Sequence, residues 1–191
     1  MDQFEQYKGV KFSNVAWLPD ESGFFYSRYP ENDAGEFDDS QTVSIYVHAI
    51  GTAQNEDTKV FSFDGKPTWN PSPLVIQDGE TLLISVFEGY EANGVYAKSL
   101  KEKNSKLITI FDKWDGRYDF IGEKEDTLFF TSTADAPTGK VVKVEFDNGV
   151  QSSETVIEST SDTLNSVSLL GGKLFAQYLK DVKGQVSVFD L

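Results

Sequence analysis

Few residues in this sequence could carry out catalysis. The chain has one histidine, His48, and no cysteine. His48 lies in SIYVHAI, an apolar stretch typical of a β-strand. A Ser-His-Asp arrangement would have to use it, yet no G-x-S-x-G turn that could present a nucleophilic serine occurs. We therefore predict no catalytic residue, and we expect His48 to be a strand histidine that is either partly exposed or hydrogen-bonded.

Residues 31–39, ENDAGEFDD, bring together the carboxylates of Glu31, Asp33, Glu36, Asp38 and Asp39. Oxygen-rich loops can hold calcium, but this spacing does not match an EF-hand, and acidic runs are usually solvated. One histidine cannot form a histidine metal cluster, and phosphate-loop and dinucleotide-binding fingerprints are absent from the sequence. We predict no metal and no cofactor, with a calcium site in the acidic loop as the alternative.

The overall composition indicates a globular protein. The chain has 191 residues, 39% of them hydrophobic and 14% aromatic, and a net charge of −14. A negative field of this kind repels phosphate backbones, so we expect no nucleic-acid partner. The longest apolar run, TLLISVF, is too short to span a membrane, and the N-terminus does not resemble a signal peptide. We expect a soluble protein without a membrane partner, and leave cytoplasm or periplasm undecided.

One pattern recurs along the chain about every fifty residues. A short strand, a polar turn and a second strand occur in VAWLPDESGFFYSRYP, PLVIQDGETLLISVFEG, YDFIGEKEDTLFFTSTADAP and NSVSLLGGKLFAQYLKDV. The second strands begin with consecutive apolar residues, anchored by Phe24, Leu82, Leu128 and Leu174. Such runs predict strands that are buried on both faces.

Further strands complete each repeat. The third strands, VSIYVHAI, GVYAKSL, KVVKVEF and QVSVFDL, alternate as half-buried strands do, and three repeats add a fourth strand, TKVFSF, KLITIF or ETVIES. Four meandering strands per repeat are typical of β-propeller blades. We predict an all-β fold with almost no helix. It would be a single partial β-propeller over 1–191, with about four blades of four-stranded antiparallel sheet near 11–63, 64–112, 113–159 and 160–191, the last blade lacking its outer strand.

Blades must stack on neighbours to bury both faces, so three arrangements are open: a small closed ring, an open arc, or part of a larger ring. The N-terminal MDQFEQYKGV could supply the outer strand that the fourth blade lacks. Unpaired ends could instead join two copies into a homodimer. Trp17, Trp69 and Trp114 each lie at or just before an inner strand, where we expect packing, and one that faces a rim could stack on a ligand.

Several segments resemble the propeller of the prolyl oligopeptidase (prolyl endopeptidase) family. They are KFSNVAWLPDESGFFYSRYP, KPTWNPSPLVIQDGETLLISVFEG, FDKWDGRYDFIGEKEDTLFFTSTADAP and LFAQYLKDVKGQVSVFDL, in the family's order, so the resemblance runs from about Lys11 to Leu191. In that family a seven-bladed propeller covers the active site of an α/β-hydrolase serine peptidase. The propeller admits only short peptides, which are cut after proline.

The resemblance implies that this chain is a middle portion of such a propeller. The family's catalytic serine, aspartate and histidine belong to the hydrolase domain, so the chain alone should be inactive, and that domain should be its partner. By position, the resemblance implies that Phe12, Asn70 and Tyr90 line the peptide-binding side and bind short proline-containing peptides weakly. The alternative is a stand-alone propeller module that binds or scaffolds a protein or peptide.

Overall fold

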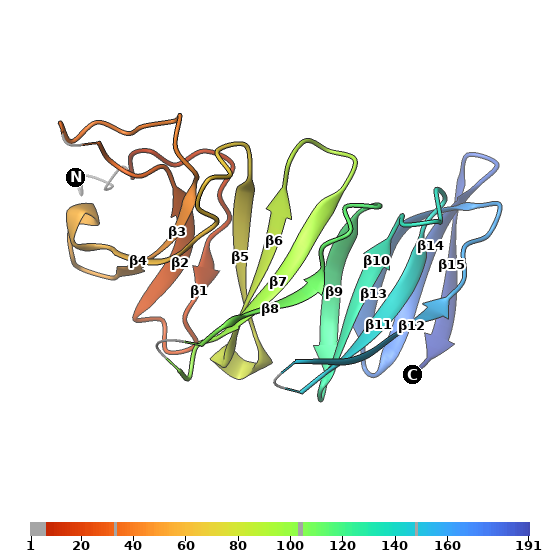
Figure 1. The fold of residues 1–191 in the computed structure, drawn as a ribbon. Helices are drawn as coiled ribbons and strands as arrows, with labels where there is room; N and C mark the ends of the chain where they lie inside the picture. The colour runs from red at the N-terminus through yellow and green to blue at the C-terminus, as the bar shows by residue number, and fades with distance from the viewer. Residues whose placement is uncertain (1–6, 33, 103–104, 148) are drawn as a thin grey trace, which may run out of the picture. The chain divides into compact units, whose positions relative to one another are not determined.

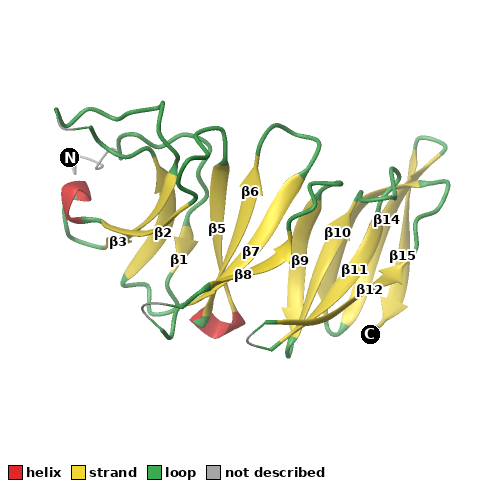
Figure 2. Cartoon of the chain, in the orientation of Figure 1, coloured by secondary structure: helices red, strands yellow, loops and turns green. Residues whose placement is uncertain are grey.

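A computed structural model describes residues 7–32, 34–102, 105–147 and 149–191. It contains four antiparallel sheets, each made of strands consecutive in the chain (Figure 1). In these residues the helical elements are two short 3-10 turns, η1 (Gln54–Glu56) and η2 (Gln77–Gly79) (Figure 2). None of the described helices is long and apolar enough to cross a membrane. The predicted all-β meander is confirmed.

The chain divides into two compact units, which we describe separately. The first comprises Met1–Gly89 and Tyr96–Leu107, and the second comprises Tyr90–Val95 and Ile108–Leu191.

The first sheet has the order β1-β2-β3-β4. Its strands are β1 (Ala16–Trp17), β2 (Gly23–Arg28), β3 (Ser44–Ala49) and β4 (Thr58–Ser62). In the turn between β1 and β2, the Asp20 carboxylate accepts hydrogen bonds from both the backbone and the side chain of Ser22, and these bonds lower the pKa of Asp20. Gly23 is required where the turn ends, because a Cβ there would lie 2.2 Å from the carbonyl oxygen of His48.

The second sheet has the order β5-β6-β7-β8. Its strands are β5 (Asn70–Ile76), β6 (Thr81–Phe87), β7 (Asn93–Ser99) and β8 (Leu107–Phe111). Within the first unit, β2 packs against β5, and the Ser27 hydroxyl donates a 2.6 Å hydrogen bond to the carbonyl of Pro71. This bond satisfies a buried polar group between the two sheets.

The second unit contains the third and fourth sheets. The third sheet consists of β9 (Tyr118–Lys124), β10 (Thr127–Ser132), β11 (Lys140–Phe146) and β12 (Val150–Ile157). The fourth consists of β13 (Thr163–Leu170), β14 (Lys173–Lys180) and β15 (Lys183–Asp190), so it has three strands, as predicted. Both sheets contribute to one apolar core, formed by Phe129, Val141, Ile157, Leu174, Ala176 and Tyr178.

Strand burial departs from the sequence prediction in two ways. β2, β6 and β10 are largely buried on both faces, as expected, but β14 alternates between buried and exposed residues because only one of its faces packs on the core. Conversely, β3 and β7 do not alternate as predicted and are mostly buried. β3 is buried because its second face is also covered, as described below.

The proposed use of the N-terminal segment as the outer strand of the fourth blade is wrong for its described part. Residues 1–6 lie outside the described residues, but Tyr7, Lys8 and Gly9 bond to the first sheet and its loops. Polar contacts with His48, Gln54 and Tyr29 hold the segment there, so it serves the sheet that follows it in the chain.

Candidate functional site

Phe12 lies on an exposed turn that is fixed just after it. Phe12 is 77% exposed, and its backbone is left-handed with φ 56°. Next along the chain, the Ser13 hydroxyl accepts a 2.7 Å bond from the backbone N–H of Ser27. Such backbone geometry at a bulky residue costs about 1–3 kcal/mol and is concentrated at functional sites. The turn therefore presents an apolar ring to solvent in a defined place.

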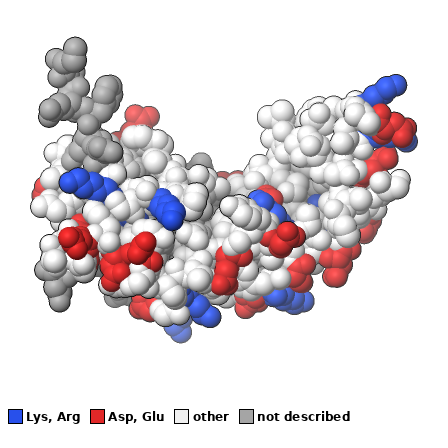
Figure 3. Space-filling model, turned by 90° about the horizontal axis from the view of Figure 1, so that it is seen from above, with Lys and Arg blue, Asp and Glu red and all other residues white. Residues whose placement is uncertain are grey.

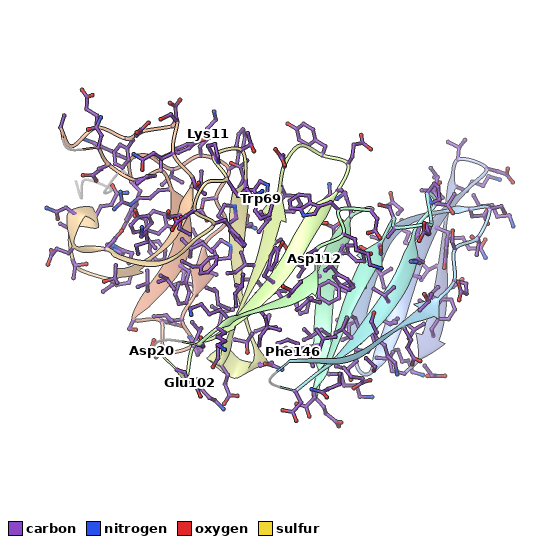
Figure 4. All side chains as sticks on the ribbon, viewed as in Figure 1. Lys11, Asp20, Trp69, Glu102, Asp112 and Phe146 are labelled. Atoms are coloured by element: carbon purple, nitrogen blue, oxygen red, sulfur yellow. The ribbon has the colours of Figure 1, made fainter. Side chains whose placement is uncertain are left out.

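Asn70 opens β5 beside that turn. Its side chain is half-buried and donates a 3.1 Å bond to the carbonyl of Thr68. The turn and the start of β5 are joined by a 2.9 Å bond from the Asn14 amide to the Ser72 hydroxyl. In Figure 4, Lys11 and Trp69, which directly precede Phe12 and Asn70, lie at one end of the first unit's strands, opposite Asp20 and Glu102. The structure therefore brings Phe12 and Asn70 into neighbouring segments.

Trp69 is fixed by contacts within the first unit. Its indole N–H donates a 3.2 Å bond to Glu88, which also accepts a 2.6 Å bond from the Thr68 hydroxyl. Its ring packs on Phe63 with a centroid distance of 5.2 Å, and the Lys66 ammonium lies 4.9 Å from its ring centroid. Trp69 thus positions Asn70 through packing, as expected of the tryptophans.

Tyr90 lies in the connection between β6 and β7, where it begins the second unit. Tyr90 is 85% exposed, and it follows Gly89, whose backbone is left-handed with φ 79°. The chain places it two residues after Glu88, the residue that holds Trp69. Of the three predicted contact residues, Phe12 and Asn70 lie in segments that the bond between Asn14 and Ser72 joins, and Tyr90 is an exposed residue described with the second unit.

The other two tryptophans differ in exposure. Trp17 is 53% exposed, and its ring meets Phe24 edge-on at a centroid distance of 5.3 Å. Trp114 is half-buried and has a left-handed φ of 55°. Trp17 therefore has the larger surface open for stacking on a ligand.

His48 is buried, which rules out the partly exposed alternative and confirms the hydrogen-bonded one. Its side chain is 1% exposed; Nδ1 lies 2.7 Å from the Asp57 carboxylate and Nε2 lies 2.7 Å from the Tyr7 hydroxyl. A carboxylate accepts hydrogen bonds, so Nδ1 donates to Asp57, and Nε2 bonds to the Tyr7 hydroxyl. Both ring nitrogens are thus engaged, and neither is free to take a proton from a serine.

The Asp57 carboxylate holds a second donor, the Tyr26 hydroxyl. Burial, and then this hydrogen bond, raises the pKa of Tyr26 above its usual range. Sequence reasoning missed Tyr7, Tyr26 and Asp57. A signal for Asp57 existed, because His48 and Asp57 flank the connection between two strands that were correctly predicted to be adjacent, and a hairpin brings such flanking residues together.

The acidic loop forms a closed local structure. The backbones of Glu31 and Phe37 form a short antiparallel β-bridge. The Arg28 guanidinium donates a 3.3 Å hydrogen bond to the Glu31 carboxylate and forms an ion pair with it. Asp38 accepts hydrogen bonds from Ser40 and Gln41, which lower its pKa. Asp33 lies outside the described residues, and among the described ones no group of three or more His, Cys, Asp or Glu could hold a metal. In Figure 3, acidic side chains are scattered over the visible face.

The second unit contains a hollow with both polar and apolar lining residues that was not predicted from the sequence. Its volume is about 400 Å³, and it lies among β9, β10 and β13. Arg117 and Asp119 form a 2.7 Å ion pair on its wall. Hydroxyl and amide groups from Thr131, Ser132, Thr133, Asn165 and Ser166 line the rest of its polar surface. Ser and Thr residues on separate strands gave no local motif that could have marked it.

Comparison with known proteins decides the family. The family described as "Prolyl oligopeptidase, N-terminal beta-propeller domain" matches residues 2–191. The chain belongs to the prolyl oligopeptidase family. The resemblance seen in the sequence is therefore confirmed, and it extends over nearly the whole chain.

Individual members of the prolyl oligopeptidase family are similar to this chain over most of its length. A prolyl endopeptidase from Elizabethkingia meningoseptica is 33% identical over 95% of this chain, and prolyl oligopeptidase A from Galerina marginata is 27% identical over 97% of it. A structure from a study of two prolyl endopeptidases and inter-domain dynamics superposes with a TM-score of 0.83 at 30% identity, covering 97% of this chain and 26% of that one. This chain spans about a quarter of its relatives, 26% and 27% of the two named above.

Proposed function

We propose that this chain is the substrate-access part of a prolyl oligopeptidase-type serine peptidase that cleaves short peptides after proline. The observation that carries the proposal is the match of residues 2–191 to the family's N-terminal propeller domain. The parent's hydrolase domain is then the chain's main partner. Catalysis would come from that domain, in keeping with a histidine whose two ring nitrogens bond to Asp57 and Tyr7.

Phe12, Asn70 and Tyr90 are the proposed peptide contacts. The exposed rings of Phe12 and Tyr90 can pack on apolar side chains such as proline, and the half-buried Asn70 amide can bond to a peptide backbone. Each is on a turn or at the first residue of a strand, where binding residues are common. Because the hydrolase domain would complete the pocket, affinity for the chain alone should be weak.

A peptide titration tests these contacts. We expect the 191-residue chain to bind a short, capped proline-containing peptide with a dissociation constant of about 1 mM or weaker, since only part of a pocket is present. Phe12→Ala and Tyr90→Ala should each weaken binding severalfold. Val182→Ala is the matched control, because Val182 is 92% exposed on a turn that is not assigned to the contacts. Equal effects of all three substitutions would contradict the assignment.

The second candidate is a stand-alone binding or scaffold module, and the fourth sheet favours it. Leu179, Val186 and Val188 lie on one face of that sheet and are each at least half exposed. An uncovered apolar face of this kind suits a protein partner, including a second copy of the chain. Sedimentation would then detect a homodimer. A monomer at high concentration would remove the homodimer and leave the peptidase proposal standing.

A further inference from the structure

The hollow among β9, β10 and β13 presents a positive and a negative charge side by side. The Arg117 guanidinium and the Asp119 carboxylate lie 2.7 Å apart on its wall, and their side chains are 40% and 46% exposed. A guanidinium has five N–H donors and a carboxylate accepts several hydrogen bonds, so each group can hold the other and also bond to a ligand. The wall therefore offers neighbouring positions for an anionic group and a cationic group.

The segment that carries this pair is fixed by four hydrogen bonds. The Arg117 N–H donates a 2.9 Å bond to the Thr133 hydroxyl, and the Thr133 N–H donates a 3.1 Å bond to the Arg117 carbonyl. The buried Asn93 side chain accepts a 2.7 Å bond from the Tyr118 N–H and donates a 3.0 Å bond to the Tyr118 carbonyl. Because the two residues before Asp119 are already held in place, little ordering is needed when a ligand binds.

Two β-bulges border the same hollow. The pairing of β9 with β10 shifts at Ile121, and the pairing of β13 with β14 shifts at Asn165, so each strand has one extra residue there. Both residues line the hollow. Bulges change the direction of side chains and are common next to active sites. Asn165 is exposed, and its amide can both donate and accept hydrogen bonds.

The apolar part of the wall and the volume of the hollow indicate the size of a ligand. Ile121, Leu164 and Val167 are partly buried and pack on the core of the second unit, so this part of the wall is held in place. The volume of about 400 Å³ corresponds to roughly a dozen water molecules of the liquid. A ligand that fills it would have on the order of a dozen non-hydrogen atoms, which is the size of a dipeptide with one small apolar side chain.

The charges decide among the classes of small ligand. The chain has a net charge of −14 and repels an anion, which would also have to share Arg117 with Asp119. A cation would bond to Asp119 but lie close to the guanidinium. A zwitterion satisfies both groups, and because it has no net charge, the field of the chain does not oppose its approach.

We propose that this hollow is a binding site for a zwitterionic dipeptide with an apolar side chain. The ligand carboxylate bonds to Arg117 and its ammonium group bonds to Asp119. Its peptide group bonds to the Asn165 amide, and its side chain packs against Leu164 and Val167.

This site is separate from the peptide contacts proposed above. It uses none of Phe12, Asn70 and Tyr90, and the capped peptide of the earlier titration has neither of the terminal charges that the hollow would recognise. Either proposal can therefore fail while the other stands.

A titration of the 191-residue chain with glycyl-valine, followed through backbone amide resonances, tests the site. We expect saturable shifts at Arg117, Asp119 and Asn165, with a dissociation constant in the millimolar range for about a dozen non-hydrogen atoms. Acetyl-glycyl-valine has no ammonium group, and glycyl-valine amide has no carboxylate. Each should bind about fivefold more weakly or worse, because one charge of the pair is left without a ligand partner.

Two substitutions assign each charge to its residue. Asp119→Asn should weaken glycyl-valine about fivefold without weakening acetyl-glycyl-valine, and Arg117→Gln should weaken glycyl-valine similarly without weakening glycyl-valine amide. A general loss of structure would weaken every peptide and could not give this pattern. Glu154→Gln is the matched control, because it breaks an exposed 2.8 Å ion pair with Lys143 in the third sheet and should change nothing.

Three results would overturn the proposal. They are the absence of saturable shifts at the hollow, equal binding of the three peptides, and equal weakening of glycyl-valine by Glu154→Gln and Asp119→Asn. The peptide series needs only the wild-type chain, so it decides the question even if a variant does not fold.

Discussion

One face of the first sheet is covered by other segments of the chain, whereas one face of the fourth sheet is exposed to solvent. The face of the first sheet that bears Phe24, Tyr26, Tyr46 and His48, here the capped face, is covered by Tyr7 and satisfied by Asp57. The face of the fourth sheet opposite Leu174, Ala176 and Tyr178, here the bare face, carries Phe175, Gln177, Leu179, Val186 and Val188. Of these, Leu179 is 50%, Val186 60% and Val188 53% exposed.

This difference shows how segments outside the sheets can cover one face of a propeller sheet. Blade faces are normally buried by stacking. On the capped face, the segment around Tyr7 and the acidic loop with Phe37 cover the sheet. The buried polar groups of Tyr26, His48 and Asp57 are hydrogen-bonded to one another. Among the residues that the structure describes, none covers the bare face in this way, so Leu179, Val186 and Val188 stay exposed.

The largest expected effect on stability is at an aspartate of the capped face, and an aspartate of the bare face provides the comparison. Asp57→Ala should lower the free energy of unfolding by about 3–5 kcal/mol, because His48 and Tyr26 would keep buried donors without their acceptor. The matched substitution is Asp190→Ala, which removes the partner of Lys173 from a side chain that is 83% exposed, and exposed ion pairs contribute little. Urea unfolding measures both. Similar losses would contradict the comparison.

The two faces of β14 provide the next comparison. Leu174 is 1% exposed in the core of the second unit, whereas Leu179 lies on the bare face. Leu174→Ala should lower the free energy of unfolding by about 2–5 kcal/mol, and Leu179→Ala by less than about 1 kcal/mol. If Leu179→Ala were as costly as Leu174→Ala, the bare face would have to be covered.

Alkaline titration separates two buried tyrosines. Burial and the hydrogen bond to Asp57 raise the pKa of Tyr26, while burial alone raises that of Tyr178. A raised folded-state pKa contributes stability that is present below the unfolded value of 10.0 and is lost as pH rises through the folded value. Stability should therefore fall as pH rises above 10.0, and Tyr26→Phe should flatten the fall more than Tyr178→Phe. The reverse order would show that Asp57 does not matter.

The smallest expected effect on stability is on the bare face itself. Val188→Lys should change the free energy of unfolding by less than about 0.5 kcal/mol, because the side chain is exposed. It should nevertheless reduce self-association seen by sedimentation, if the wild-type chain associates through this face. Val150→Lys, at an exposed valine in the third sheet, is the control. Equal association in both variants would place the contact elsewhere.

The sequence was sufficient for the fold because each hairpin carries its own signals. Pro19–Gly23 and the apolar anchors Phe24, Leu82 and Leu128 are local patterns, and the strands follow them. The capped face could not be found in this way. The bond between Tyr7 and His48 joins residues 41 positions apart, and nothing in the sequence around Tyr7 indicates which sheet it covers. For the same reason, local pattern could not predict that β3 is buried.

Incubation of the pure 191-residue chain with a proline-containing chromogenic peptide tests the central claim most directly. The claim is that these residues contribute a propeller, with its packing and peptide contacts, and that hydrolysis depends on residues of the parent's hydrolase domain. The predicted result is no cleavage above the buffer rate. Cleavage by the chain that is abolished by a serine-peptidase reagent would contradict the account.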